Sequence, residues 1–350
     1  MSDQFWAGRN VFLTGHTGFK GGWLALWLAQ KGALVHGYAL QAEHAGGIYL
    51  TCDVPSHLAW ETLADIRDDQ ALRSALKQSK PEIVLHLAAQ PLVRASYNDP
   101  VETMSTNVMG LVSVFEAIRA CDSVRAVVNV TSDKCYENRE WIWPYRENEA
   151  LGGHDPYSAS KACAEIVTSS YRSSFLANAG VAVATARAGN VIGGGDCADD
   201  RLLPDFLRAS DRGEPLVVRN PEATRPWQHV LEPLAGYIKL AQALVNDGPA
   251  FAEAWNFGPA PDDIIKVRQI ADTLCGQLPG ASWTLTETEN PKEAQSLALD
   301  SAKARSRLGW SPRWQIKTAL KHVLGWHLAW QAGANMAGVT LEQIADYEAT

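Results

Sequence analysis

The chain alternates short apolar runs with longer amphipathic stretches, most regularly in its first half. The apolar runs have the length of strands and cover residues 11–13, 34–39, 82–89, 126–130 and 181–187. The stretches with helical spacing cover residues 18–31, 68–79, 101–120 and 157–178. Near-continuous apolar strands joined by helices form parallel sheets that are covered on both faces. The pattern therefore predicts an α/β fold, with a doubly wound parallel sheet of Rossmann type over residues 1–189.

The pattern changes after Asn190, where glycines and prolines interrupt the chain more often. Short strands are predicted at 216–219 and 228–231, with helices at 233–246 and 267–276. We interpret residues 190–350 as a smaller C-terminal α/β lobe that reaches over the carboxyl ends of the strands. Some of its segments can return to the first domain.

Composition and charge narrow the classes of function. The 350 residues are 46% hydrophobic and 20% charged, which is typical of a folded protein, and the net charge of -8 argues against a nucleic-acid partner. A small anionic ligand needs only a few local cations. Six cysteines without CxxC spacing, the lack of a signal-like start and the lack of a long apolar run predict reduced thiols and a cytoplasmic protein. No metal site is predicted.

A glycine-rich segment opens the first strand–helix unit. Gly15 allows a tight turn, Gly18 lets backbone N–H groups approach a pyrophosphate, and Gly21 lets the helix pack closely on the strand. The intervening residues that complete this predicted dinucleotide-binding segment are His16, Thr17, Phe19 and Lys20.

The choice between NAD and NADP stays open at this point, because residues 37–41 contain no acid to bind a ribose 2'-hydroxyl. They contain no Arg or Lys for a 2'-phosphate either, which favours NAD, with Glu43 as a distant candidate. Asp65 and Ile66, just after the third strand, are candidates to contact the adenine ring. The alternative is that Asp65 is a surface residue at the start of the helix from Asp68.

A second group of candidate functional residues follows the strand at 126–130. Tyr157 and Lys161 lie one turn apart on a helix that Asp155 caps, so the ammonium can lower the pKa of the phenol and help to hold a nicotinamide ribose. Ser132, Asp133 and Lys134 come directly after the strand, where ligands bind in open α/β sheets. These five residues are the predicted catalytic set.

The segment 14–21, taken with Tyr157 and Lys161, resembles the extended short-chain dehydrogenases that act on nucleotide sugars, the NAD-dependent epimerase/dehydratase family. Further segments resemble its 4,6-dehydratases, in particular the CDP-glucose branch: 5–6, 86–94, 131–136, 187–196 and 225–230. The likeness extends over almost the whole chain. It implies a hydro-lyase with NAD as cofactor and a nucleotide sugar, CDP-glucose, as substrate.

The resemblance also implies a mechanism without net redox change. Tyr157 accepts the proton of the C4 hydroxyl as NAD oxidises C4, Asp133 protonates the leaving C6 hydroxyl as the C5 proton departs, and NADH reduces C6. Ser132 hydrogen-bonds the C4 oxygen. Lys134 stands where related sugar dehydratases commonly carry Glu. It is either the C5 base, if its pKa is depressed, or an electrostatic stabiliser of the enolate while another group or water moves the proton.

Other roles follow from the resemblance and from residue chemistry. Leu87, Ala88, Ala89 and Asn107 are expected to line or position the cofactor site, although Asn107 could equally be a core polar contact. The expected substrate ligands are Gln90, Asn190, Arg201, Arg219, Arg225 and His229. Arginine suits a diphosphate because its planar fork binds two oxygens. One or two of these arginines could instead form surface ion pairs, Trp227 or His229 could pack on the substrate, and a lone His is more often structural.

The resemblance further implies a homodimer, formed by helices 101–120 and 157–178 as a four-helix bundle. It also implies deoxysugar supply for surface polysaccharide such as the O-antigen of lipopolysaccharide. Alternatives are a nucleotide-sugar 4-epimerase, a dehydratase of dTDP-glucose or GDP-mannose, an NADP-dependent reductase of a keto sugar, and a dinucleotide sensor without catalysis. Asp133 and Lys134 argue against the epimerase, and the joint presence of the catalytic set argues against the sensor.

Overall fold

A computed structural model describes residues 3–286 and 296–350. Its centre is a seven-stranded sheet in the order β11-β6-β5-β4-β1-β2-β3, in which all neighbours are parallel. The strands are β1 (Asn10–Thr14), β2 (Leu34–Ala39), β3 (Trp60–Leu63), β4 (Ile83–His86), β5 (Ala126–Val130), β6 (Ala182–Ala188) and β11 (Ala254–Phe257). The predicted doubly wound parallel sheet is confirmed.

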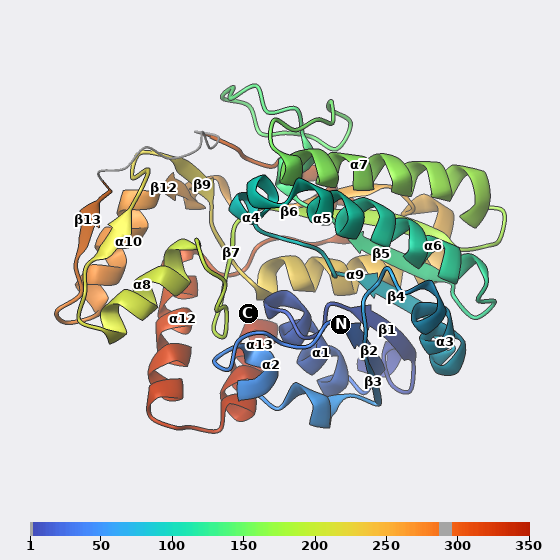
Figure 1. The fold of residues 1–350 in the computed structure, drawn as a ribbon, viewed down its shortest axis with the longest axis horizontal. Coiled ribbons are helices and arrows are strands. Elements are labelled where there is room, and N and C mark those ends of the chain that lie inside the picture. The colour runs from blue at the N-terminus through green and yellow to red at the C-terminus, as the bar shows by residue number, and fades with distance from the viewer. Residues whose placement is uncertain (1–2, 287–295) are drawn as a thin grey trace.

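Helices cover both faces of this sheet (Figure 1). Those described are α1 (Phe19–Gln30), α2 (Ile48–Thr51), α3 (Asp69–Ser79), α4 (Val93–Asn98), α5 (Pro100–Met104), α6 (Gly110–Arg119), α7 (Pro156–Tyr171), α8 (Leu202–Asp211), α9 (Leu231–Asp247), α10 (Val267–Gln277), α11 (Ala302–Leu308), α12 (Ile316–Gln331) and α13 (Met336–Ala349). Because strand side chains alternate, Val11 and Leu13 pack in a core with α1 and α9, while Phe12 packs in a second core with α3, α6 and α7.

Two of the predicted helices are interrupted. The stretch 101–120 is α5 and α6 joined by a π-helical turn, Ser105–Met109, and α7 passes into a second π-helical turn, Arg172–Leu176. Neither turn contains the Gly or Pro that marks a helix break in a sequence, so the sequence pattern did not reveal them.

The smaller lobe is built on short strand pairs. They are β7 (Val191–Ile192) with β10 (Gln228–His229), β8 (Leu216–Val218) with β13 (Trp283–Leu285), and β9 (Thr224–Pro226) with β12 (Ile264–Lys266). These pairs pack with α8, α10 and α12 around a core that includes Phe206, Trp227 and Ile270. The lobe lies at the carboxyl-end edge of the sheet (Figure 1).

Part of the chain after residue 190 completes the main sheet instead of the lobe. The register of β11 on β6 sets Ala254 beside Thr185 and Phe257 beside Ala188. Helix α9 packs on β5 and β6, and α13 packs on α1 and α12. Among residues 3–286 and 296–350, no helix is both long and apolar enough to cross a membrane.

Candidate active site

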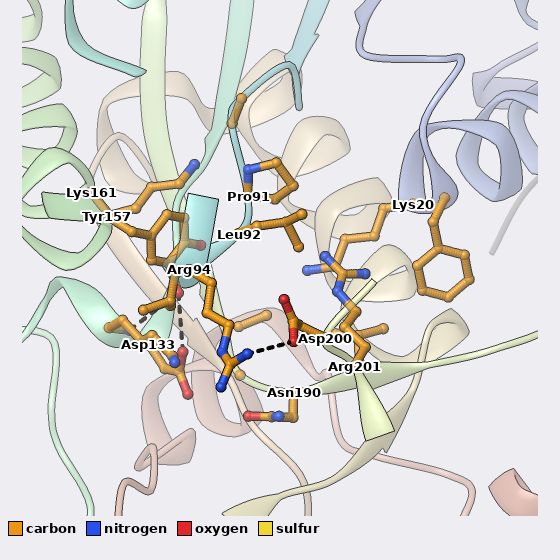
Figure 2. Close-up of a pocket in the computed structure, with 18 of the residues that line it drawn as sticks. Lys20, Pro91, Leu92, Arg94, Asp133, Tyr157, Lys161, Asn190, Asp200 and Arg201 are labelled. Atoms are coloured by element: carbon orange, nitrogen blue, oxygen red, sulfur yellow. Dashed lines mark hydrogen bonds and ion pairs between the residues drawn. The ribbon is translucent and has the colours of Figure 1, made fainter. Parts of the chain in front are cut away.

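A large cavity opens between the carboxyl ends of the central strands and the lobe (Figure 2). Its volume is about 1340 Å³, more than the ~300–1,000 Å³ of a typical pocket for one small ligand. The main sheet contributes the glycine loop and the ends of β4 and β5, and the lobe contributes residues near α8 and β8. The cavity is therefore large enough for a cofactor and a substrate together.

The glycine loop forms one wall and leaves no room for side chains at two positions. Gly15 has a φ of +78°, and a Cβ on it would lie 2.8 Å from the backbone nitrogen of Ala88. A Cβ on Gly21 would lie 2.0 Å from the carbonyl oxygen of Gly15. Glycine is required at both positions for the loop to lie against β4 and for α1 to approach the loop.

The start of α1 faces this cavity with its backbone N–H groups uncapped. Gly18 occupies the N-cap and makes no side-chain capping bond, and Thr17, Gly18, Phe19 and Lys20 line the cavity. A helix N-terminus of this kind binds phosphate through N–H groups and the helix dipole. The cradle fits the pyrophosphate of a dinucleotide.

Thr14, at the end of β1, fixes the loop after β4. Its hydroxyl accepts hydrogen bonds of 3.1 Å from the backbone nitrogens of Leu87 and Ala88. Leu87, Ala88 and Ala89 line the cavity, as the sequence predicted for that loop.

The wall beyond the glycine loop carries the predicted adenine contacts. Asp65 and Ile66 line the cavity, while Glu43 is exposed and lies away from it. The carboxylate of Asp65 accepts a hydrogen bond of 2.9 Å from the side chain of Arg67, which holds the pKa of Asp65 below its usual value. Asp68 caps α3, accepting from the backbone of Ala71, so Asp65 does not serve as the cap.

Tyr157 and Lys161 project from the first turns of α7 into the cavity (Figure 2). Asp155 accepts a 2.9 Å hydrogen bond from the backbone of Ser158 and starts the helix, as predicted. Burial lowers the pKa of Lys161 to about 8, and burial raises the pKa of Tyr157 to about 12. The expected lowering of the phenol's pKa by Lys161 is not seen in this structure: desolvation raises the pKa, and the groups that oppose this rise are Ser132 and Arg201.

Ser132 and Asp133 lie directly below this phenol. The Ser132 hydroxyl donates a 3.0 Å hydrogen bond to Oδ1 of Asp133, and its contact with Tyr157 opposes the rise in the pKa of the phenol. Oδ2 of Asp133 is buried and has no hydrogen-bond partner within the part of the chain that the structure describes. Burial raises the pKa of Asp133, against the opposing charges of Lys134, Lys20 and Arg225. The arrangement favours a carboxyl group that keeps its proton.

A residue that the sequence did not single out makes room for this carboxyl. A Cβ on Gly189 would lie 2.8 Å from Oδ2 of Asp133. Gly189 does not have a positive φ, so its backbone conformation does not require glycine. The close approach of Asp133 does, and the spacing of residues along the chain does not reveal this contact.

A buried ion pair connects α7 to β6 outside the cavity. Arg187 and Glu165 are each 3% exposed and are 2.8 Å apart. Glu165 also accepts a 2.7 Å hydrogen bond from Thr185, and Arg187 donates one of 2.7 Å to Tyr136. This network joins α7 to β6 and to the segment after Lys134.

Asn107 and Gln90 support the site from outside the cavity. Asn107, in the π-helical turn, donates to the carbonyl of Gln90 at 3.0 Å and to Ser160 on α7 at 2.8 Å. The amide side chain of Gln90 donates to Leu92 and Thr103. The structure therefore places both side chains among the supports of the loop after β4, and neither lines the cavity.

Two predicted histidines also lie away from the cavity. His16 has no exposed surface and its Nε2 lies 2.7 Å from a carboxylate oxygen of Glu61. His229 is fully buried between the rings of Trp23 and Trp314, and burial lowers its pKa to about 3. The structure therefore places His229 in the core of the fold, where its ring packs against aromatic side chains, and not on the wall of the cavity.

The substrate side of the cavity contains the remaining predicted residues Asn190, Arg201, Arg219, Arg225 and Trp227. Arg201 pairs with Asp196 at 2.9 Å and Arg219 pairs with Asp200 at 2.7 Å. Arg94, which the sequence gave only as part of a similar segment, lines the same wall and also pairs with Asp200. No sequence signal joins Arg94 to Asp200, because their meeting depends on the packing of α4 beside the lobe.

Comparisons with known proteins agree with this geometry. The family model described as GDP-mannose 4,6 dehydratase matches residues 12–323. The chain is 51% identical to the CDP-glucose 4,6-dehydratase of Salmonella typhimurium strain LT2, over 99% of this chain and 98% of that protein.

Solved structures show the same fold. Epimerase Mth375 of Methanothermobacter thermautotrophicus matches with a TM-score of 0.81 and 22% identity, over 94% of this chain and 95% of that one. The dTDP-glucose 4,6-dehydratase DesIV of Streptomyces venezuelae, with NAD and TYD bound, matches with a TM-score of 0.77 and 22% identity, over 93% and 99%.

Proposed function

The chain belongs to the GDP-mannose 4,6-dehydratase family, and we propose that it is an NAD-dependent hydro-lyase that converts CDP-glucose to CDP-4-keto-6-deoxyglucose. The observation that carries the chemistry is the contact of Ser132 with both Tyr157 and Asp133 at the floor of one cavity. The curated relative of 51% identity supports CDP-glucose as the substrate.

The glycine loop and the uncapped start of α1 would hold the pyrophosphate of NAD, and Asp65 and Ile66 would contact its adenosine end. When bound, NAD would supply the oxidation of C4 of the sugar and the later reduction of C6. The residues after β4 line the same cavity, and Asn107 fixes their backbone through its hydrogen bonds to Gln90.

Tyr157, in its phenolate form, accepts the proton of the C4 hydroxyl and becomes the neutral phenol. The contact with Ser132 favours the phenolate before this transfer, and Lys161, one turn along α7, supplies a positive charge beside the cofactor site. Because burial opposes the phenolate, this proton transfer needs both partners in place.

Asp133 supplies the proton that converts the C6 hydroxyl to water. Burial raises the pKa of this carboxyl and so favours its protonated form, and its Oδ2 makes no hydrogen bond with the described residues that would compete with the leaving group. This function separates a dehydratase from an epimerase, which needs no acid at C6.

Lys134 lines the cavity next to Asp133, and its charge lowers the pKa of that carboxyl. We assign it to electrostatic stabilisation of the enolate that forms as a water molecule in the cavity takes the C5 proton. Asn190, Arg201 and Arg225 are placed to bind the nucleotide-sugar, with the arginines toward its diphosphate.

We also propose a cytoplasmic homodimer that supplies deoxysugars for surface polysaccharide such as O-antigen. All six cysteines are free thiols, as a reducing compartment requires. Apolar side chains are exposed along the proposed interface: Val101 is 77% exposed, Met109 57% and Ile166 57%. They lie on α5, the π-helical turn and α7, which run side by side (Figure 1).

The deciding experiment is incubation of the purified protein and NAD with CDP-glucose, dTDP-glucose, UDP-glucose or GDP-mannose. The 4-keto-6-deoxy product is followed by its alkaline absorbance and by mass. Turnover with CDP-glucose that is lost in Tyr157→Phe supports the proposal. Loss of water from another sugar nucleotide would change the nucleobase that we assign to the substrate. Inversion at C4 without loss of water would show that the protein is an epimerase and not a dehydratase.

A further inference from the structure

One carboxylate on the cavity wall is shared by two arginines from different parts of the fold. Asp200 lies 3.2 Å from Arg94 and 2.7 Å from Arg219. Figure 2 shows the contact with Arg94, whose guanidinium points across the cavity toward the lobe. All three residues line the cavity.

The three residues come from separate elements. Arg94 is on α4, directly after the loop that follows β4, and Arg219 follows β8 of the lobe. Asp200 belongs to the connection between β7 and α8. The carboxylate therefore joins the main sheet's side of the cavity to the lobe's side, at the place where an occupant has to contact both.

Both guanidinium groups carry a positive charge on the cavity wall, so each can attract an anion that enters the cavity. A diphosphate brings more charge than a carboxylate and more oxygens for the planar forks of two arginines. An anion of this kind competes well for both side chains.

The pairs made by Asp200 are also the easily broken ones. The side chain of Asp200 is 40% exposed and that of Arg94 33%, and exposed ion pairs contribute little to stability. By contrast, the Asp196 carboxylate that holds Arg201 is only 5% exposed. Asp196 is therefore a fixed support, whereas Asp200 can leave its partners.

The backbone of Asp200 is in the left-handed region, with a φ of 60°. Asp and Asn adopt this conformation more readily than other non-glycine residues. Asp200→Asn therefore removes the negative charge and retains the left-handed backbone conformation.

We propose that Arg94 is a further binding residue for the diphosphate of the substrate, together with Arg219, and that Asp200 holds both arginines in place until the diphosphate displaces it. The proposal rests on the proposed function for the identity of the anion.

The test measures binding of CDP and of cytidine to the NAD-loaded enzyme by calorimetry. Arg94→Met is expected to weaken CDP binding about tenfold and to leave cytidine and NAD unchanged, since it removes one charge-assisted contact to phosphate. Arg94→Lys keeps the positive charge but loses the planar fork of the guanidinium. Its CDP affinity is expected to lie between that of the unchanged enzyme and that of Arg94→Met. Asp200→Asn is expected to tighten CDP binding about threefold, because the competing carboxylate is gone.

Asp199→Asn is the matched control, because it removes the same charge one residue away. Asp199 is 76% exposed, pairs with Arg208 and does not line the cavity, so CDP binding should not change. The gain from Asp200→Asn should disappear when Arg94 and Arg219 are both changed to Met.

Three results would overturn the inference. They are weaker CDP binding in Asp200→Asn, unchanged CDP binding in Arg94→Met, and a loss of NAD affinity in Arg94→Met without a loss for CDP. Turnover of CDP-glucose by the unchanged enzyme is measured separately. If turnover fails while the Arg94 and Asp200 variants change the binding of CDP, UDP or dTDP as expected, the proposed function is wrong and the anion site stands.

Discussion

Ser132 donates a 3.0 Å hydrogen bond to one oxygen of Asp133 and leaves the other oxygen of that carboxyl buried without a partner among the described residues. The bonded oxygen is fixed in orientation, so the second oxygen has a defined direction into the cavity. A proton on that second oxygen has no protein acceptor to compete with a substrate. The pair therefore leaves one oxygen of the carboxyl to act as the proton donor.

Asp133→Asn is expected to stop elimination and to spare oxidation at C4. The amide cannot donate an acidic proton, and loss of a general acid lowers kcat by roughly 10²–10⁴-fold. Stopped-flow absorbance should show reduced nicotinamide accumulating after CDP-glucose is added. Ser132→Ala is the comparison, and it should slow the oxidation as well, because Ser132 also contacts Tyr157. Near-normal turnover in Asp133→Asn would mean that another group is the acid.

Lys134→Arg and Lys134→Met separate charge from proton transfer. Arginine keeps the positive charge but does not act as a base at neutral pH. If Lys134 stabilises the enolate, Lys134→Arg should stay within about tenfold of the normal rate while Lys134→Met falls by about a hundredfold or more. The rate and the incorporation of deuterium at C5 in D₂O are the measurements. Equal inactivity of both variants would identify Lys134 as the base.

Lys161→Met is expected to inactivate the enzyme and to make it more stable near neutral pH. Burial lowers the pKa of Lys161 from 10.5 to about 8, so the folded protein binds this proton less well than the unfolded chain. The charged lysine therefore destabilises the fold below pH 8, and this penalty is lost as the pH rises from 8 to 10.5. Stability should increase by about 3 kcal/mol at pH 7 and by about 1 kcal/mol at pH 10.

Urea denaturation of the cofactor-free protein at the two pH values measures this difference. Lys161→Arg is the control, since it retains a buried cation and should not stabilise the protein. A gain that is the same at both pH values would come from packing instead of from the titration of Lys161.

Gly21→Ala is expected to disrupt the glycine loop. The new Cβ would lie 2.0 Å from the Gly15 carbonyl oxygen, and overpacking of this kind costs about 1–3 kcal/mol or displaces the backbone. NAD affinity and thermal stability should both fall. Gly276→Ala in α10 is the matched control, because a Cβ there meets nothing within 4 Å and helix propensity favours alanine. Unchanged NAD affinity in Gly21→Ala would contradict this account of the loop.

The sequence predicted the centre of the sheet well for a physical reason. Strands such as β4 and β5 are buried along their whole length, so they read as continuous apolar runs. The edge strand β3 has no such run: Trp60 is 51% exposed and Leu63 47%, and no range was assigned to it. The short strand pairs of the lobe are too brief to produce a period.

The site was predictable where its residues are close along the chain. Tyr157 and Lys161 share one helix, and the glycine loop is a single turn, so local spacing was sufficient. His229 was predicted to contact the substrate, because the sequence does not show which way a histidine side chain points. In the structure it points into an aromatic core. The meeting of Arg94 with Asp200 needed the packing of distant elements.

The position of β11 has a consequence for how the protein is made. While the ribosome synthesises residues 189–253, β6 has no neighbour on its outer side, and it stays open until Ala254–Phe257 emerge. At about 5–20 residues per second this interval lasts several seconds, and an unpaired strand edge can pair with another chain during that time. Slower translation of residues 189–253 is therefore expected to lower the yield of correctly folded protein.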